Sequence, residues 1–164
     1  GYALTAIGND VALEDIARIA DVFYIGGTKV GAMFGEAVVF THGNMPKNFV
    51  TLVKQHGALL AKGWLLGVQF YTLFTDDLYC RIARHANDAA DRIREVLVER
   101  GYTLTFDAPT NQIFITLDNA TSGRLQRNVR LGFMEKADDT HTVMRICTSW
   151  ATTDEQVEQL IALL

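Results

Sequence analysis

The segment ADVFYIGGTKVGAMFGEAVVF, residues 20–40, places one lysine between two apolar stretches and surrounds it with glycines. DVFYI (21–25) and EAVVF (36–40) have the composition of short buried strands. The intervening GGTKVGAMFG (26–35) has too many glycines for a regular element and predicts a loop. We therefore expect two neighbouring strands, with Lys29 buried in an apolar setting within the loop that joins them.

The residues around Lys29 favour carbonyl chemistry over phosphate binding by a Walker A loop. Thr28 precedes the lysine, whereas a Walker A motif needs Ser or Thr after it. An apolar setting disfavours an ammonium ion and favours the nucleophilic amine that forms Schiff bases. The glycines allow a bulky cofactor to approach the backbone, and Thr28 offers a hydroxyl to a phosphate. A surface lysine in a tight turn is the alternative, and these residues alone favour it.

Arg145 is the second residue with a candidate role. It lies in TVMRICTSW, residues 142–150, and alternates with apolar neighbours. An arginine in such a strand can hold a carboxylate through two parallel hydrogen bonds. A structural salt bridge or a charge on an edge strand is the alternative, and for Arg145 taken alone it is the better interpretation. Lys29 and Arg145 together indicate an amino-acid substrate held by its carboxylate.

Composition limits the class of protein. The chain has 164 residues, enough for one ordinary domain or for part of a larger one, and a net charge of −4. This charge argues against a nucleic-acid or anionic-membrane partner, and no apolar run reaches membrane-spanning length. Cys80 and Cys147 are far apart, which indicates reduced thiols in the cytoplasm. No metal site is expected, because the histidines show no paired spacing with Cys or carboxylates: His42, His56, His85 and His141.

Helical patterns occupy much of the first hundred residues. Asn9 or Asp10 can cap a short helix whose apolar positions are Leu13, Ile16 and Ile19. Further helices are predicted from Asn48, after an early helical Pro46, to about Leu60, and over residues 64–74. The clearest helix runs from Leu78 to Arg100, with Gly101 as the residue that ends it. Its apolar stripe comprises Tyr79, Ile82, Ala83, Ala86, Ala90, Ile93 and Leu97.

The pattern changes after Gly101 and predicts a small α+β unit. Residues 102–106, 113–117 and 142–150 resemble strands, and residues 111–112 and 137–141 mark turns or loops. Residues 124–135 are predicted to form a helix that runs into a loop. Thr153 and Gln156 form a capping-box pattern ahead of a last helix.

Four segments in this order resemble the threonine aldolase and β-eliminating lyase family: DVFYIGGTKVGAMFGEAVVF, KQHGALLAKGWLLGVQFYTLF, PTNQIF and MRICTSWAT. These are pyridoxal-phosphate (PLP) enzymes of the aspartate-aminotransferase fold type, or fold type I. The resemblance implies an α/β fold and runs through essentially the whole chain. It assigns residues 1–75 to the end of the large PLP-binding domain, 76–101 to a connecting helix, and 102–164 to the small α+β C-terminal domain.

The resemblance also implies roles for individual residues. Lys29 matches the lysine that holds PLP as a Schiff base, and Thr28 matches a hydroxyl position near the cofactor phosphate. Arg145 matches the arginine that binds the substrate α-carboxylate. Lys54 and Lys62 lie where this family reaches across a subunit interface toward the phosphate; solvated helix lysines are the equal alternative.

The activity implied by the resemblance is PLP-dependent cleavage of a β-hydroxy-α-amino acid such as L-threonine to glycine and an aldehyde. Ser149 stands where related aldolases often have histidine, which favours the β-eliminating-lyase branch and places strict threonine specificity in doubt. The alternatives are another fold type I enzyme, either a β-eliminating lyase or an aminotransferase, and an inactive fragment that acts only in oligomerisation.

The chain begins at Gly1 without a methionine, and the family's ring-stacking and pyridine-nitrogen residues lie upstream of its first motif. We therefore expect the C-terminal half of a longer protein, inactive alone and completed by its N-terminal half. The resemblance implies a homodimer or homotetramer in the cytoplasm.

Overall fold

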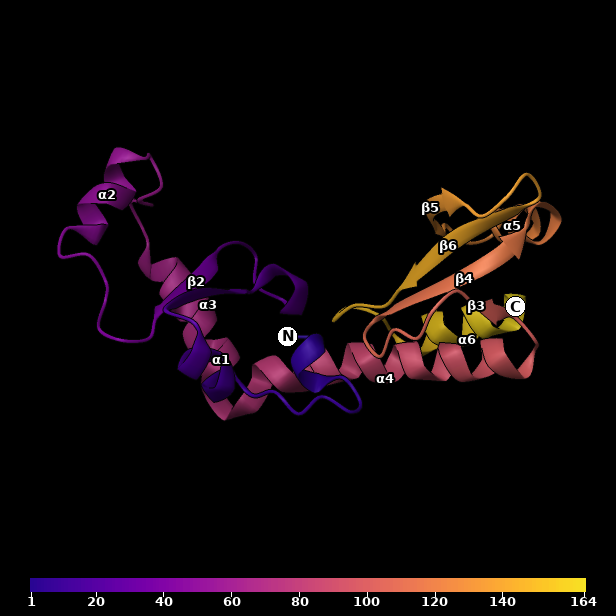
Figure 1. The fold of residues 1–164 in the computed structure, drawn as a ribbon, viewed down its shortest axis with the longest axis horizontal. Helices are drawn as coiled ribbons and strands as arrows, with labels where there is room; N and C mark the ends of the chain where they lie inside the picture. Colours follow the sequence, from indigo (N-terminus) through magenta and orange to yellow (C-terminus); the bar gives the residue numbers. More distant parts are fainter. The chain divides into compact units, whose positions relative to one another are not determined.

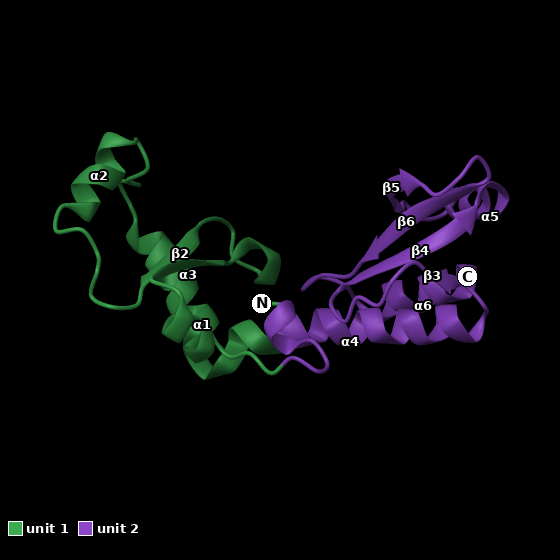
Figure 2. Cartoon of the chain, in the orientation of Figure 1, with its two compact units in different colours: residues 1, 10–81 green, residues 2–9, 82–164 purple.

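The computed structural model describes residues 1–164 and divides the chain into two compact units (Figures 1 and 2). Unit 1 comprises Gly1 and residues 10–81, and unit 2 comprises residues 2–9 and 82–164. The division falls within one long helix, α4 (Leu78–Glu99). Each unit has its own sheet and is described separately below.

Unit 1 is built around a β-hairpin. Strands β1 (Val22–Gly26) and β2 (Glu36–Phe40) pair antiparallel, from Val22 opposite Phe40 to Gly26 opposite Glu36. The predicted pairing of neighbouring strands is therefore confirmed. The loop between them contains a 3₁₀ turn, η2 (Thr28–Val30), which carries Lys29.

The helices of unit 1 follow the predicted order, but three details of the prediction are wrong. The elements are α1 (Leu13–Ile19), α2 (Phe49–Gln55), α3 (Trp64–Phe74) and the 3₁₀ turn η3 (Thr75–Asp77). The N-cap position of α1 is occupied by Ala12 and not by Asn9 or Asp10. The Asp15 carboxylate holds the helix start there by accepting from the Ala12 N–H at 2.7 Å. Helix α2 ends before Leu60, since Gly57 adopts a positive φ of 70° that stops the helix, and Pro46 lies in the loop before it.

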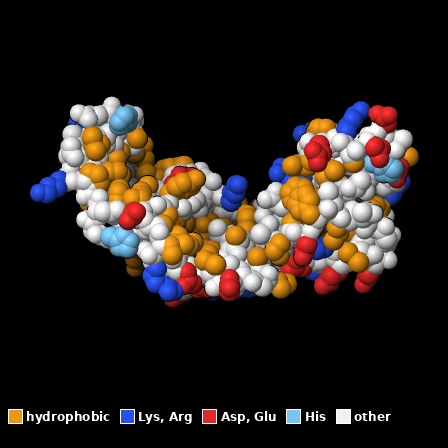
Figure 3. Space-filling view, in the orientation of Figure 1, with side chains coloured by type: hydrophobic (Ala, Val, Ile, Leu, Met, Phe, Trp, Pro, Cys, Tyr) orange, Lys and Arg blue, Asp and Glu red, His pale blue; other side chains and the backbone are white.

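Many large apolar side chains of unit 1 are exposed, and Figure 3 shows them gathered over this unit. The hairpin alternates exposed and half-buried residues along both strands. A two-stranded sheet of this kind is marginally stable on its own in water. The most exposed large apolar residues of unit 1 are Ile19, Tyr24, Met33, Val50, Trp64 and Tyr71.

Unit 2 contains a four-stranded antiparallel sheet in the order β3-β4-β6-β5. Its elements besides α4 are η1 (Ala3–Thr5), β3 (Thr103–Leu104), β4 (Gln112–Asp118), α5 (Asn119–Leu125), β5 (Gly132–Lys136), β6 (His141–Cys147) and α6 (Asp154–Leu163). The three predicted strands are present. The predicted helix over residues 124–135 is wrong, because α5 ends at Leu125 and residues 132–136 pair with β6 as an edge strand. Gln112 also belongs to β4 and not to a turn.

The core of unit 2 lies between one face of the sheet and helices α4 and α6. The predicted stripe of α4 is buried except for Ile82, which is half-buried. Ala90, Ile93 and Leu97 pack in one cluster with Ile113, Ile115 and Leu117 of β4, Met144 and Ile146 of β6, and Val157 of α6. Burial of these aliphatic side chains is the main stabilising contribution to the unit.

Two helix ends in unit 2 follow from their sequences. Gly101 has a φ of 77°, and the Gly101 and Tyr102 N–H groups donate to the carbonyls of Val98 and Leu97 at 3.0 and 2.9 Å. This is the pattern by which a left-handed glycine closes a helix. At the start of α6, the Thr153 side chain and the Gln156 side chain cap each other's backbone N–H groups, as predicted. No helix of the chain combines the length and apolarity needed to cross a membrane.

Candidate active site

Lys29 lies on a tight turn that glycine makes possible. The N–H groups of Val30 and Ala32 both donate to the Gly27 carbonyl at 3.0 Å. A Cβ on Gly27 would lie 2.8 Å from the Ala32 Cβ and 3.0 Å from Cζ of Phe70 in α3. Real Cβ atoms do not come as close as the first of these distances, so Gly27 is needed for the turn to close on Ala32, and the second distance leaves little room beside α3.

Lys29 is exposed, which corrects the expectation that it is buried within this chain. A 3₁₀ turn has three residues per turn, so Gly27 and Val30 share the buried side while Thr28 and Lys29 face outward. A Cβ added at Gly26 or Gly31 would meet no atom within 4 Å. The amine and the Thr28 hydroxyl therefore belong to exposed residues, and the glycines on either side of the turn are not crowded by other atoms.

The strand before Lys29 is held in place by Tyr79. The Tyr79 hydroxyl donates to the Gly26 carbonyl at 2.9 Å, and the ring stacks on Phe74 with a centroid distance of 5.2 Å. Tyr79 is almost completely buried. A buried hydroxyl needs a hydrogen-bond partner, and the Gly26 carbonyl provides it. This contact fixes the end of β1 immediately before the lysine turn.

Arg145 lies on the face of the unit 2 sheet opposite the core. Its neighbours Met144 and Ile146 are buried in the core, and successive side chains of a strand alternate between faces. Across the sheet it stands opposite Phe114 of β4 and Gly132 of β5. The guanidinium donates from Nη1 to Oε1 of Gln112 at 3.2 Å, whereas its Nε is buried without a hydrogen-bond partner.

The salt-bridge alternative for Arg145 has no support within unit 2. The ion pairs of this unit involve Arg92, Arg94 and His141, and Arg145 takes no part in them. Its one hydrogen-bond acceptor is a neutral amide. The positive charge of Arg145 is therefore not neutralised by a carboxylate of its own unit and can bind an anion.

The predicted site residues fall in both units. Thr28 and Lys29 are adjacent on η2, Lys54 lies in α2, and Lys62 lies just before α3; all four are exposed residues of unit 1. Arg145 belongs to unit 2. The sequence pattern predicts no site role for Gln112, whose contact with Arg145 depends on the register between β4 and β6.

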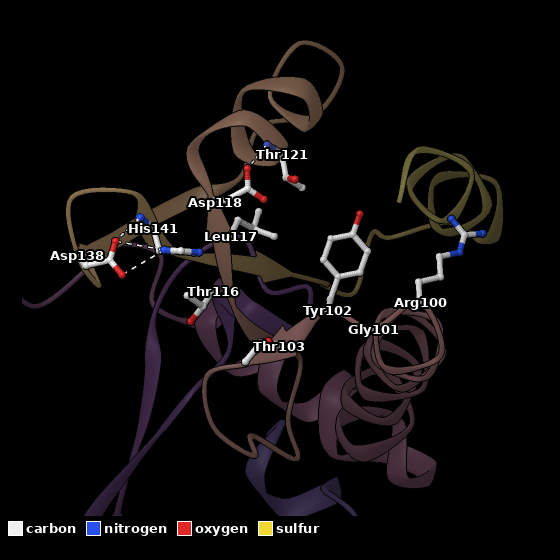
Figure 4. A pocket seen from close by; sticks show the side chains of 10 residues that line it. All are labelled: Arg100, Gly101, Tyr102, Thr103, Thr116, Leu117, Asp118, Thr121, Asp138 and His141. Atoms are coloured by element: carbon white, nitrogen blue, oxygen red, sulfur yellow. Dashed lines mark hydrogen bonds and ion pairs between the residues drawn. The ribbon is translucent and has the colours of Figure 1, made fainter.

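Unit 2 also has an open pocket of about 580 Å³, which contains none of the predicted site residues (Figure 4). Its lining residues are Arg100, Gly101, Tyr102, Thr103, Thr116, Leu117, Asp118, Thr121, Asp138 and His141. The pKa of Asp138 is well below its usual range, mainly because the Thr140 hydroxyl and N–H donate to its carboxylate. The pKa of Asp118 is lowered by the Thr121 side chain and N–H. Both carboxylates thus accept hydrogen bonds from nearby backbone N–H groups: Asp118 caps α5, and Asp138 closes the β5–β6 turn.

Comparison with solved structures places this fold in a known class. The chain superposes on a threonine aldolase from Leishmania major with a TM-score of 0.93 and 39% identity, over 99% of this chain and 47% of that one. A serine palmitoyltransferase solved with PLP matches with a TM-score of 0.56 and 14% identity, over 87% of this chain and 38% of that one, a likeness that shows the fold alone. The architecture is that of part of a fold type I PLP enzyme, as predicted.

Within that class, the chain is similar to threonine aldolases. It is 30% identical to the low-specificity L-threonine aldolase of Pseudomonas aeruginosa over 141 aligned residues. These residues make up 85% of this chain and 40% of that relative. The resemblance indicated by the four sequence motifs is therefore confirmed. The chain spans less than half the length of the proteins it matches, and no protein-family model matches it.

Proposed function

We propose that the whole protein is a PLP-dependent lyase that cleaves a β-hydroxy-α-amino acid such as L-threonine to glycine and an aldehyde. The observation that carries the proposal is the similarity to the Leishmania major threonine aldolase, at 39% identity and a TM-score of 0.93 across 99% of this chain. The similarity to a bacterial low-specificity L-threonine aldolase supports the same reaction.

The residues of η2 fit the cofactor. PLP carries an aldehyde and a phosphate; the exposed Lys29 offers an amine to the first and Thr28 a hydroxyl to the second. The open space beside Gly26 and Gly31 leaves room for the ring. Lys54 and Lys62 are exposed and would supply further positive charge to a phosphate, from the same or a neighbouring subunit.

In this proposal each unit has a separate task. Lys29 would hold the cofactor covalently, and the bound cofactor would supply an electron sink for the electron pair released when the Cα–Cβ bond breaks. Arg145 binds the α-carboxylate of the substrate through its planar guanidinium and so fixes the orientation of the Cα–Cβ bond. Its lack of an ion-pair partner within unit 2 is consistent with this use.

The proposal includes a domain assignment, the N-terminal part of the same protein and a homo-oligomer. We propose that residues 1–75 end a large PLP-binding domain, that residues 76–101 form the connecting helix, and that 102–164 form the small domain. The exposed apolar residues of unit 1 support burial against the N-terminal part of the same protein. A homodimer or homotetramer and a cytoplasmic location belong to the same proposal.

The test uses the full-length protein. It is incubated with PLP, reduced with borohydride and digested, and the peptide that gains a pyridoxyl group is identified by mass spectrometry. We expect the label on Lys29 and its loss in Lys29→Ala, with Lys47→Ala, at an exposed lysine that has no proposed role, as the matched variant that keeps it. Release of glycine and an aldehyde from L-threonine, with serine and an aromatic amino acid as comparison substrates, then tests the reaction. A folded, PLP-exposed protein with unlabelled Lys29 would contradict the proposal.

A further inference from the structure

We propose that Gln112 is a positioning residue for Arg145, which it holds through a neutral amide so that the guanidinium keeps its charge for the substrate carboxylate. The inference rests on the proposed function, because it takes Arg145 as the carboxylate-binding group. Gln112 lies within the PTNQIF segment, but the resemblance implies no role for it.

The register of the sheet places Gln112 beside Arg145. Arg145 of β6 stands directly opposite Phe114 of β4, and Gln112 lies two residues before Phe114 on the same face. Such diagonal positions on an antiparallel pair are within reach of long side chains. The contact follows: Nη1 of Arg145 donates to Oε1 of Gln112 at 3.2 Å.

The neutral acceptor distinguishes Arg145 from two other arginines of unit 2 that pair with carboxylates. Arg92 binds the carboxylates of Asp154 and Glu158, and Arg94 binds that of Asp91. A carboxylate partner would compete with an incoming carboxylate for the same guanidinium. An amide oxygen orients the guanidinium without cancelling its charge.

The guanidinium of Arg145 is held by its neighbours, but not every N–H group on it has a hydrogen-bond acceptor. Gly132 lies opposite Arg145, and a Cβ there would contact the Arg145 Cβ and Nε at 3.5 Å. These are ordinary van der Waals distances, so Arg145 packs closely on the β5 backbone, and its Nε is buried without a partner. Gln112 is therefore the one side chain that hydrogen-bonds and orients the group.

Gln112 is itself held at a fixed point of the sheet. Its neighbour Asn111 accepts a hydrogen bond at its carbonyl from the Thr148 N–H at 3.0 Å, and Asn111 Nδ2 donates to the Thr148 carbonyl at 2.7 Å. These contacts flank the Gln112–Cys147 pair and set the register that brings Gln112 to Arg145. The positioning role thus depends on an anchored strand and not on a mobile surface side chain.

The test compares Gln112→Glu with Gln112→Met in the full-length enzyme. Gln112→Glu keeps the shape but adds a competing charge, so we expect KM for the amino acid to rise by about tenfold or more with a smaller change in kcat. Gln112→Met removes the acceptor without adding charge, and a smaller rise is expected. Gln126→Glu, at an exposed residue at the end of α5, adds the same charge elsewhere in unit 2 and should leave KM unchanged. Direct binding of glycine, measured by calorimetry, should weaken in parallel with KM.

Arg145→Ala separates this inference from the proposed function. If Gln112 acts through Arg145, Gln112→Glu should add little to the effect of Arg145→Ala, so the two losses should not be additive. A strong effect of Arg145→Ala with wild-type KM in a folded Gln112→Glu variant would overturn the positioning role and leave the function standing. Additive losses would also overturn it. An unchanged KM in Arg145→Ala would contradict the proposed function itself, and the role of Gln112 with it.

Discussion

Asn111 and Thr148 bind each other through backbone and side chain on neighbouring segments of unit 2. The Thr148 N–H donates to the Asn111 carbonyl at 3.0 Å, and Asn111 Nδ2 donates to the Thr148 carbonyl at 2.7 Å. The Thr148 hydroxyl donates in turn to the Ala86 carbonyl of α4 at 2.5 Å. Asn111 is 8% exposed and Thr148 2% exposed, so these polar groups have no access to water as a substitute partner.

Loss of this buried contact should destabilise unit 2. Thr148→Val keeps the shape but removes the hydroxyl, and Asn111→Ala leaves the Thr148 carbonyl without its side-chain donor. We expect each to lower the free energy of unfolding by about 1–3 kcal/mol, the typical cost of a buried polar group left unpaired. Urea titration of the purified chain measures this change. Thr148→Ser retains the hydroxyl and should lose less, and equal losses in the Ser and Val variants would show that the hydroxyl has no such role.

Gly101 should be intolerant of a side chain. Its φ of 77° lies in the left-handed region, and the turn it forms closes α4. Gly101→Ala should lower the free energy of unfolding by about 1 kcal/mol, because an L-residue is strained there. Gly123→Ala is a matched control within α5, where an added Cβ meets no atom within 4 Å. There we expect a gain of about 0.5–1 kcal/mol, since alanine favours helix interiors. Changes of the same sign in the two variants would contradict the argument.

The sequence predicts best where local pattern and tertiary packing agree. The stripe of α4, its terminal Gly101 and the capping box of Thr153 and Gln156 are all present, because each depends on residues close together in the chain. Strand β5 was missed because it is an edge strand with mostly exposed residues, so no alternation of apolar side chains marks it. It forms through pairing with β6, a partner that sequence pattern alone does not identify.

The candidate site shows the same limit. Lys29 is recognisable from its glycine-rich surroundings, but its exposure follows from the 3₁₀ turn, which turns Gly27 and Val30 inward and the lysine outward. Arg145 is recognisable from its alternation with apolar residues. Gln112 is not, since its contact with Arg145 depends on the register between two strands more than thirty residues apart.

Asp138 should make the β5–β6 hairpin sensitive to acid. Its carboxylate accepts hydrogen bonds from the N–H groups of Thr140 and His141 and from the Thr140 hydroxyl, which hold its pKa below the ordinary value of 3.8. Because the pKa of Asp138 is lower in the folded than in the unfolded protein, its ionised carboxylate stabilises the fold at pH values above the ordinary pKa of 3.8. This stabilisation decreases below pH 3.8 and is lost as the pH falls through the pKa of the folded state. Amide hydrogen exchange of β5 and β6 should therefore accelerate, relative to its intrinsic rate, below about pH 3.8.

Asp138→Asn tests the origin of that acid response. The variant should exchange faster at neutral pH and show a weaker further change on acidification. Asp139→Asn removes the same charge from the same turn but leaves the accepting carboxylate, so it should behave like the wild-type protein. An unchanged acid response in Asp138→Asn would assign it to other carboxylates, such as Asp118 at the start of α5, whose pKa is also lowered.

Arg145→Lys should separate the charge of Arg145 from its shape. Lysine keeps the positive charge but has a single ammonium in place of a planar fork, so it can neither bind a carboxylate through two parallel hydrogen bonds nor keep the same geometry with Gln112. In the full-length enzyme we expect KM for the amino acid to rise by about tenfold, and kcat to fall as well, because the substrate is less precisely oriented. Steady-state kinetics with L-threonine measures both. PLP incorporation at Lys29 should be unaffected, since Arg145 is assigned to the substrate and not to the cofactor. If Arg145→Lys retained wild-type KM and kcat, positive charge alone would suffice at this position, and the planar geometry on which the role of Gln112 depends would have no function.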